Sequence, residues 1–238
     1  MFPIVVKRPT YVEPAAGVYY LVAENGVFQV RDTPLYRGVT RVTGGVPGLL
    51  PEHEHLRLKF PRLPRAVIED VIALFEEAYR RWRGEAMVFV FYRAETREFR
   101  VDVPVQTLPA RKTSEGRWLA DLAVRYGDAA RPSGFVQLGT AHSHAELSAS
   151  ASGIDCADER YEDGLHIVFG SFAAGELSVS AAFVANGVRF LVDPADVLEP
   201  YRRPARAARP EWIARVRPQL VNEGKEGHGH GQGPRRAG

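Results

Sequence analysis

Residues 64–92, PRAVIEDVIALFEEAYRRWRGEAMVFVFY, join a helical pattern to a strand pattern. Within 65–82, apolar side chains recur at helical spacing, at Val67, Val71, Leu74, Phe75, Ala78, Tyr79 and Trp82. Gly84 is expected to end this helix. The run AMVFVFY at 86–92 is continuously apolar, which is typical of a buried strand. The stretch therefore predicts a helix that leads directly into a central strand.

Strand patterns dominate the sequence that follows. Residues 98–105, EFRVDVPV, alternate in polarity and predict a half-exposed antiparallel strand, with one face formed by Phe99, Val101, Val103 and Val105. Further strands are expected at 134–144, 164–170, 176–184 and 188–192, the last two joined by a turn at Asn186-Gly187. Residues 153–162 are expected to be helical. One helix followed by many strands, with a helix between them, predicts an α+β or α/β fold with a mixed sheet.

The two ends of the chain differ from this central part. In the first sixty residues, GVYYLV and VFQVRD flank Asn25-Gly26, a strong hairpin signal. The Pro- and Gly-rich stretch 43–55 then marks a boundary. We expect a β-rich segment at 1–60, a main domain at 61–200, a basic segment at 201–220 and a disordered tail at 221–238. Within the basic segment, residues 201–218 are interpreted as a solvated or docking helix, with contact to an anion as the alternative.

Composition narrows the class of protein. The chain has 238 residues, of which 45% are hydrophobic and 25% charged, so a packed core is expected without disulfides. A net charge of +2 does not argue for nucleic acid as a partner. Cys156 has no internal partner, which points to a reducing compartment, and a buried structural role is favoured over a reactive one. With neither a membrane-length apolar run nor a signal-peptide pattern, we expect a cytoplasmic protein without a membrane partner.

The stretch HSHAELSASASGIDCADE, residues 142–159, carries the chemistry. His142 and His144 are two residues apart at an expected strand end, so both imidazoles lie on one face. Ser152 and Asp155 follow at an expected helix start. Two imidazoles and one carboxylate leave a fourth tetrahedral position for water, as in catalytic zinc sites. We therefore predict one Zn²⁺ per chain, held by His142, His144 and Asp155.

Each part of this pattern also has a plainer interpretation. His-x-His alone is a weak signal, because the chain repeats it at His53 and His55, where a surface loop is expected. Ser152 and Asp155 also suit a capping box, with Ser152 at the N-cap and Asp155 three residues later. The two interpretations are compatible, because a helix N-terminus presents Asp155 well. The zinc-site interpretation depends on the combined spacing of all four residues.

The pattern His142-x-His144-x7-Ser152-x2-Asp155 matches the full signature of the JAMM/MPN (JAB-type) metalloproteases, and the chain resembles this family over roughly residues 65–195. The resemblance implies a JAB/MPN-like mixed sheet with flanking helices, similar to cytidine deaminases. It also implies that the two histidines and Asp155 bind zinc and that Ser152 stabilises the oxyanion. Many members have Pro after the second histidine, where this chain has Ala145; the difference bears on loop shape.

The same resemblance implies a general base. The family uses a Glu at the start of an early buried strand that follows a helix, and Glu85 occupies that place. The weaker candidates are carboxylates on the helix or near a turn: Glu76, Glu77, Glu95 and Glu98. A strand-end carboxylate facing solvent is the plainer interpretation of Glu85.

The resemblance also implies a reaction and partners. The expected activity is that of a zinc metallo-isopeptidase or peptidase, which cuts an amide or isopeptide bond after the tail of a ubiquitin-like protein. Residues 103–110, the HSH loop, 155–159 and 163–170 together resemble the bacterial PRTRC system branch, which implies an E1/ThiF-like partner as well. The alternative is a non-catalytic MPN scaffold. The retained ligand set favours the enzyme.

Two rival enzyme classes fit less well. His144-Ala145-Glu146 imitates the His-x-Glu element of zinc deaminases, but the Pro-Cys-x-x-Cys element that should follow is missing. A cysteine hydrolase would pair Cys156 with His166 or His142, yet no activating motif surrounds that thiol.

Overall fold

The computed structural model describes residues 2–15, 17–33, 36–46, 49–50, 53–121, 123–128, 130–150 and 162–221. The chain divides into two compact units, residues 1–57 and 58–238, and each is described by itself. Ser152, Asp155 and Cys156 lie outside the described residues. So do the helix expected over 153–162, except for Glu162, and the expected tail beyond Val221.

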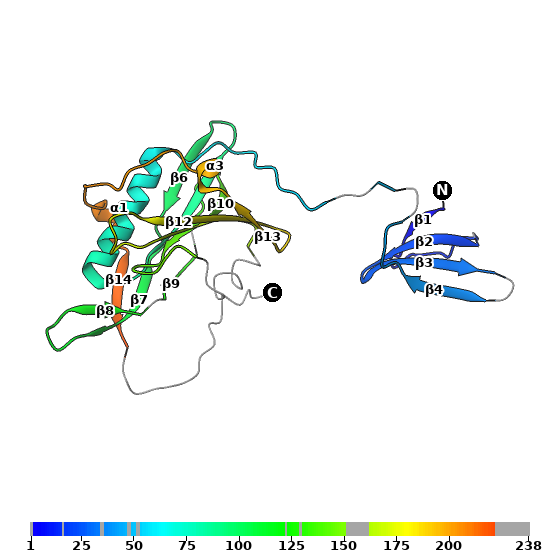
Figure 1. The fold of residues 1–238 in the computed structure, drawn as a ribbon, viewed down its shortest axis with the longest axis horizontal. Coiled ribbons are helices and arrows are strands. Elements are labelled where there is room, and N and C mark those ends of the chain that lie inside the picture. The colour runs from blue at the N-terminus through cyan, green and yellow to red at the C-terminus, as the bar shows by residue number, and fades with distance from the viewer. Residues whose placement is uncertain are drawn as a thin grey trace. The chain divides into compact units, whose positions relative to one another are not determined.

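The first unit is a small four-stranded sheet in the order β1-β2-β3-β4 (Figure 1). Its strands are β1 (Ile4–Val6), β2 (Val18–Ala23), β3 (Gly26–Asp32) and β4 (Arg37–Arg41). Its buried cluster consists of Tyr19, Leu21 and Val30. The hairpin expected from the sequence is confirmed, but Ala23 pairs with Gly26, so the turn residues are Glu24 and Asn25.

The main sheet of the second unit has six strands in the order β13-β12-β11-β10-β5-β6. They are β5 (Met87–Arg93), β6 (Glu98–Asp102), β10 (Val136–Ser143), β11 (Gly164–Gly170), β12 (Ser178–Ala185) and β13 (Val188–Val192). β10 and β11 are parallel and the other pairs are antiparallel. The sheet is therefore mixed, as expected. Asn186 and Gly187 form the β12–β13 turn, both with positive φ (52° and 77°).

The strand expected over 98–105 is shorter than the alternation predicted. β6 ends at Asp102, and Val105 is 63% exposed, although Phe99 and Val103 are buried. Pro104 explains the early end, because its ring nitrogen has no hydrogen to donate to a strand ladder.

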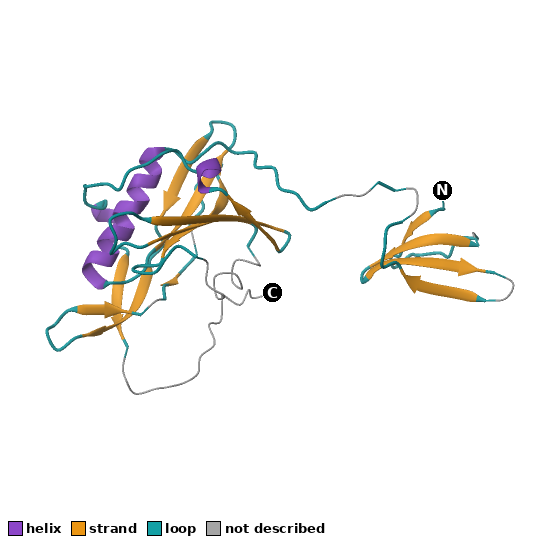
Figure 2. Cartoon of the chain, viewed as in Figure 1, coloured by secondary structure: helices purple, strands orange, loops and turns teal. Residues whose placement is uncertain are grey.

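Helix α1 (Arg65–Trp82) forms where the periodicity predicted it and covers one face of the main sheet (Figures 1 and 2). Its Phe75 ring lies 6.0 Å from that of Phe169 on β11, and Ala141 of β10 belongs to the same buried cluster. The helix ends at Arg83, which takes a left-handed conformation (φ 54°), one residue before the expected Gly84. Because side chains alternate along a strand, His142 faces away from α1.

A second sheet has the order β14-β7-β8, with β9 also paired to β7. Its strands are β7 (Gln106–Lys112), β8 (Trp118–Ala120), β9 (Arg125–Tyr126) and β14 (Val216–Leu220). The short helices α3 (Pro194–Val197) and α4 (Pro210–Ile213) complete the described elements. None of the described helices is long and apolar enough to cross a bilayer. The second unit is thus a mixed α/β structure, rich in sheet.

The basic segment 201–218 was predicted as a helix, and that prediction is wrong. Residues 201–209 are irregular, α4 makes one turn, and β14 pairs in parallel with β7. Three prolines account for this, because proline blocks the helical hydrogen-bond ladder: Pro204, Pro210 and Pro218.

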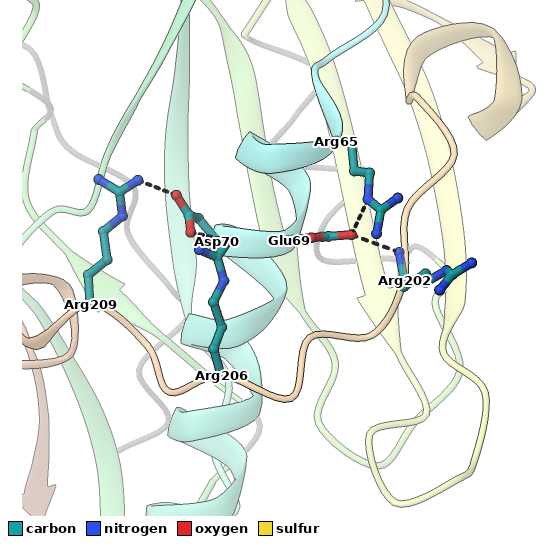
Figure 3. Close-up of polar contacts among 6 residues, drawn as sticks. All are labelled: Arg65, Glu69, Asp70, Arg202, Arg206 and Arg209. Atoms are coloured by element: carbon teal, nitrogen blue, oxygen red, sulfur yellow. Dashed lines mark hydrogen bonds and ion pairs between the residues drawn. The ribbon is translucent and has the colours of Figure 1, made fainter.

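Within the chain, arginines of this segment contact carboxylates of α1 (Figure 3). Nη2 of Arg206 lies 2.5 Å from the Asp70 carboxylate of α1, and Arg209 also contacts that carboxylate. The Arg202 backbone N–H donates to Glu69 at 3.2 Å. The segment therefore lies along α1, paired with that helix's acidic side chains.

Candidate metal centre

The end of β10 brings two imidazoles together. Nε2 of His142 and Nε2 of His144 lie 3.1 Å apart. Two nitrogens on one tetrahedral zinc, each bonded at about 2.0–2.1 Å, would be roughly 3.3–3.4 Å apart. The spacing of this pair therefore fits a shared metal ion.

The orientation of His144 also fits a ligand. The residue is buried, and its Nδ1 lies 3.3 Å from the carbonyl oxygen of Ser148. A carbonyl can only accept, so Nδ1 carries the proton and Nε2 keeps its lone pair. Metal-binding histidines are commonly held in this way. The backbone is held too, because the His144 N–H donates to the Phe169 carbonyl at 2.8 Å.

Glu85 lies two residues before β5, the strand next to β10. Strand β5 runs antiparallel to β10 with Met87 opposite His142, and the Ser143 N–H donates to the Ala86 carbonyl at 2.9 Å. Glu85 precedes Met87 by two residues and His144 follows His142 by two, so a continued antiparallel register would set Glu85 opposite His144. The half-buried Glu85 therefore stands at the same end of the sheet as the two imidazoles.

The other candidate carboxylates are placed differently. Glu77 accepts hydrogen bonds from Arg80 and Arg81, and Glu76 is paired with Arg203. Glu98 begins β6 opposite Arg93, at the far end of β5, and Glu95 lies in the turn between those strands. Of this set, Glu85 is the carboxylate nearest along the chain to Met87, the β5 residue that pairs with His142.

Two buried polar side chains, which sequence reasoning missed, hold the backbone beside Glu85. Ser143 accepts the Ala86 N–H on its Oγ at 2.9 Å. Gln106 is fully buried and bonds both backbone groups of Met87, each at 2.9 Å. β6 pairs with β5 only from Phe89 onward, so Gln106 replaces the missing neighbour strand. The sequence signal for this role was a single Gln within the otherwise mostly apolar stretch VPVQTLPA, residues 103–110.

Thr140 and His166 form a second buried polar pair on the same sheet face. Thr140 lies opposite His166 in the β10–β11 register, and its Oγ1 is 3.0 Å from Nδ1 of that ring. Nε2 lies 3.0 Å from the Glu162 carbonyl, so Nε2 donates and Nδ1 accepts. Burial lowers the pKa of His166 and favours its neutral form. Both ring nitrogens are thus engaged, which gives the Cys156–His166 alternative no support.

Glu146 has a role other than the one a deaminase would need. Its carboxylate accepts from the Tyr79 hydroxyl at 2.9 Å and lies 3.5 Å from Nη1 of Arg83, at the C-terminal end of α1. Burial raises the pKa of Tyr79, and the bond to Glu146 raises it further. Ala145, with φ 42°, makes the turn between His144 and Glu146. Proline, with φ near −65°, could not take this conformation.

The described residues contain part of the predicted ligand set. Among them, no three His, Cys, Asp or Glu side chains gather as a metal site. The structure brings His142 and His144 together and places Glu85 two residues before the strand that pairs with His142, while Asp155 and Ser152 lie outside the described residues.

Comparisons with known proteins return little for this chain. No protein-family model and no curated protein matches it. One similar solved structure is the solution structure of protein DSY2949 from Desulfitobacterium hafniense, a structural-genomics target. The match covers 72% of this chain and 100% of that chain, with 12% identity and a TM-score of 0.33. A likeness at this level supports no statement about function.

Proposed function

We propose that this protein is a zinc-dependent metallopeptidase of the JAMM type, with a JAB/MPN-like second unit. It would hydrolyse the amide or isopeptide bond that follows the extended tail of a ubiquitin-like protein. The observation that supports the proposal is the 3.1 Å separation of His142 Nε2 and His144 Nε2, next to β5, whose first residue Met87 pairs with His142 and follows Glu85 by two residues.

The donor set suits zinc. His142, His144 and Asp155 would hold the ion: two neutral imidazoles and a carboxylate, with room for one further ligand. When bound, zinc supplies Lewis acidity, which polarises the scissile carbonyl and acidifies water.

The chain's own groups would carry the protons. Glu85 takes a proton from the attacking water and returns it to the leaving amine, so no covalent intermediate is needed. The Ser152 hydroxyl donates to the developing oxyanion, a contact worth roughly 3–4 kcal/mol in comparable sites. Ser143 and Gln106 act by positioning, because they hold the two residues that follow Glu85.

The substrate proposal draws on the strand-rich surround. β6 stands at the edge of the main sheet, and an extended tail can add to such an edge by backbone pairing. Pro104 follows the strand and does not interrupt it. Small residues at the end of the tail would let its backbone approach the metal closely. The partners would be a ubiquitin-like protein or its conjugates, together with an E1/ThiF-like protein.

The test is cleavage of ubiquitin-like fusions that carry a C-terminal extension, followed by intact mass. Glu85→Gln should keep zinc but lose roughly 10²–10⁴ in rate, because an amide cannot accept the proton. Glu95→Gln is the matched control and should retain wild-type activity. A dead Glu95→Gln or Glu98→Gln beside an active Glu85→Gln would assign the base elsewhere.

Other outcomes separate the alternatives. Cleavage of short unfolded peptides, with the fusions untouched, would leave a general zinc peptidase. A folded chain that binds no zinc and cuts nothing would favour the scaffold.

A further inference from the structure

A cleft of about 650 Å³ lies at the C-terminal end of α1, outside the histidine pair. One side comes from the last turns of the helix and the other from the turn between β7 and β8. Its lining combines cations with aromatic rings, chiefly Tyr79, Arg80, Arg81, Arg83, Arg117 and Trp118. Such a lining suits a ligand with negative charge and some apolar surface.

Ion pairs with carboxylates hold the arginines of the cleft in place. Glu77 accepts from Arg80 at 2.7 Å and from Arg81 at 2.6 Å, so one carboxylate holds two guanidinium groups side by side. The hydrogen bond from Arg80 is the main reason why the pKa of Glu77 is lowered, which keeps this carboxylate ionised. Basic residues in the last turn of a helix also stabilise it.

Arg81 and Arg117 have N–H donors available to bind a ligand. Arg81 uses Nε toward Glu77, and Arg117 uses Nε toward Glu115 at 3.4 Å. In the described part of the chain, the two terminal nitrogens of each have no protein hydrogen-bond partner. The side chains are 45% and 81% exposed, so a ligand can reach them. Terminal guanidinium nitrogens bind carboxylates in a bidentate way.

The cleft is connected to both halves of the candidate metal centre. Arg83 precedes Glu85 by two residues, and its guanidinium lies 3.5 Å from Glu146, which follows His144 by two residues. Arg83 of the cleft therefore contacts a residue that lies two positions after His144.

We propose that this cleft binds an acidic segment of a polypeptide, through bidentate contacts from its arginines to Asp or Glu side chains. The use of the cleft as a substrate subsite rests on the proposed function; the binding itself does not. Three carboxylates also lie at the cleft: Glu76 in its lining, Glu115 paired with Arg117, and Glu146 paired with Arg83. Because they repel dense negative charge, the cleft favours spaced acidic side chains over a nucleic acid.

The experiment is fluorescence anisotropy with the full chain and a fluorescein-labelled peptide of alternating Glu and Gly. A matched peptide of Gln and Gly is the ligand control. The Glu peptide should bind at least about tenfold more tightly, because bonds between charged groups are lost with Gln, and added salt should weaken it. Equal binding of the two peptides overturns the proposal, as does tighter binding of a single-stranded RNA of equal charge.

Variants then locate the site. Arg81→Gln and Arg117→Gln, alone and combined, remove donors from opposite sides of the cleft, and the pair should weaken Glu-peptide binding at least about tenfold. Arg97→Gln is the matched control, an exposed arginine in the turn at the far end of β5, and should bind as wild type does. Circular dichroism and melting check that each variant folds. Equal losses in the cleft variants and in Arg97→Gln place the binding elsewhere and overturn the proposal.

The two proposals fail separately. Peptide binding should persist in His142→Ala and in chelator-treated protein, because it needs no metal. If the Glu peptide binds but no substrate is hydrolysed, the peptidase proposal is rejected and the proposed binding in the cleft stands. If hydrolysis occurs, an acidic segment beside the scissile bond should lower KM in the wild type but not in the double variant; unchanged KM in both removes the subsite role.

Discussion

The pattern His-x-His occurs twice, and its surroundings differ. His53 and His55 lie in an irregular stretch, both exposed, where Nδ1 of His55 is 3.0 Å from the His53 carbonyl. His142 and His144 lie at the end of a strand between two others, and their Nε2 atoms are 3.1 Å apart. The second pair has neighbours that hold it: the Ser148 and Phe169 carbonyls contact His144.

The difference shows what a strand adds to a two-residue motif. Only an extended backbone puts residues i and i+2 on one face. Burial then restricts the His144 ring to few rotamers, so less side-chain entropy is lost when an ion binds. An exposed loop provides neither condition. The motif is therefore informative where the strand and its neighbours come with it.

The largest contrast between the two pairs should be in zinc content. His142→Ala and His144→Ala should lose the zinc, about one per chain, that the wild type is expected to bind, and Asp155→Ala should do the same. His53→Ala and His55→Ala should keep it. Elemental analysis of the purified variants measures this. His228 and His230 are removed by ending the chain at residue 221, so that stray metal on the tail is not counted. Full zinc in all three site variants would rule out the ligand assignment.

A second change removes a side chain that supports β5, the strand next to the His142–His144 pair. Gln106→Leu leaves the N–H and carbonyl of Met87 without their side-chain partner, which should cost roughly 2–4 kcal/mol of unfolding free energy. Gln219→Leu, at an exposed position of β14, should stay within about 0.5 kcal/mol of wild type. Urea denaturation followed by fluorescence compares the two. Equal stability of both variants would remove Gln106 from its positioning role.

A third change tests the turn at Ala145, which follows the His142–His144 pair. Ala145→Pro cannot adopt φ 42° and should destabilise the chain by more than about 1 kcal/mol. Ala145→Gly, which adopts positive φ without strain, should remain within about 1 kcal/mol of wild type. Thermal unfolding measures both. A fully stable Ala145→Pro would mean that the turn accepts the residue that many JAMM proteins carry there.

The smallest effect concerns pH and the buried His166 beside the metal centre. Its lowered pKa means that the unfolded state binds more protons than the native state below about pH 6.5, so stability should fall as pH falls through that range. His166→Gln should flatten this dependence, because the amide has no proton to gain there. Unfolding free energies between about pH 5 and 8 give the slope. An unchanged slope in His166→Gln would assign the dependence to other groups.

Much of this architecture is local enough to be predicted. Helical periodicity located α1, and apolar runs, alternation and turn signals located the strands of the main sheet, because these patterns depend on neighbouring residues. Errors arose where one residue type overrides the period. Pro104 ended β6 early, and three prolines excluded the helix expected over 201–218.

The sequence by itself determined that His142 and His144 share a face, because strand alternation depends on adjacent residues only. The tertiary structure decided what stands beside them. Ala86 and Ser143 are 57 residues apart and are joined because β5 pairs antiparallel with β10, and that pairing sets Met87, two residues after Glu85, opposite His142. Gln106 and the arginine cleft depend equally on contacts between distant segments. Pairing partners and register follow from which faces pack together, and a single stretch of sequence does not contain that information.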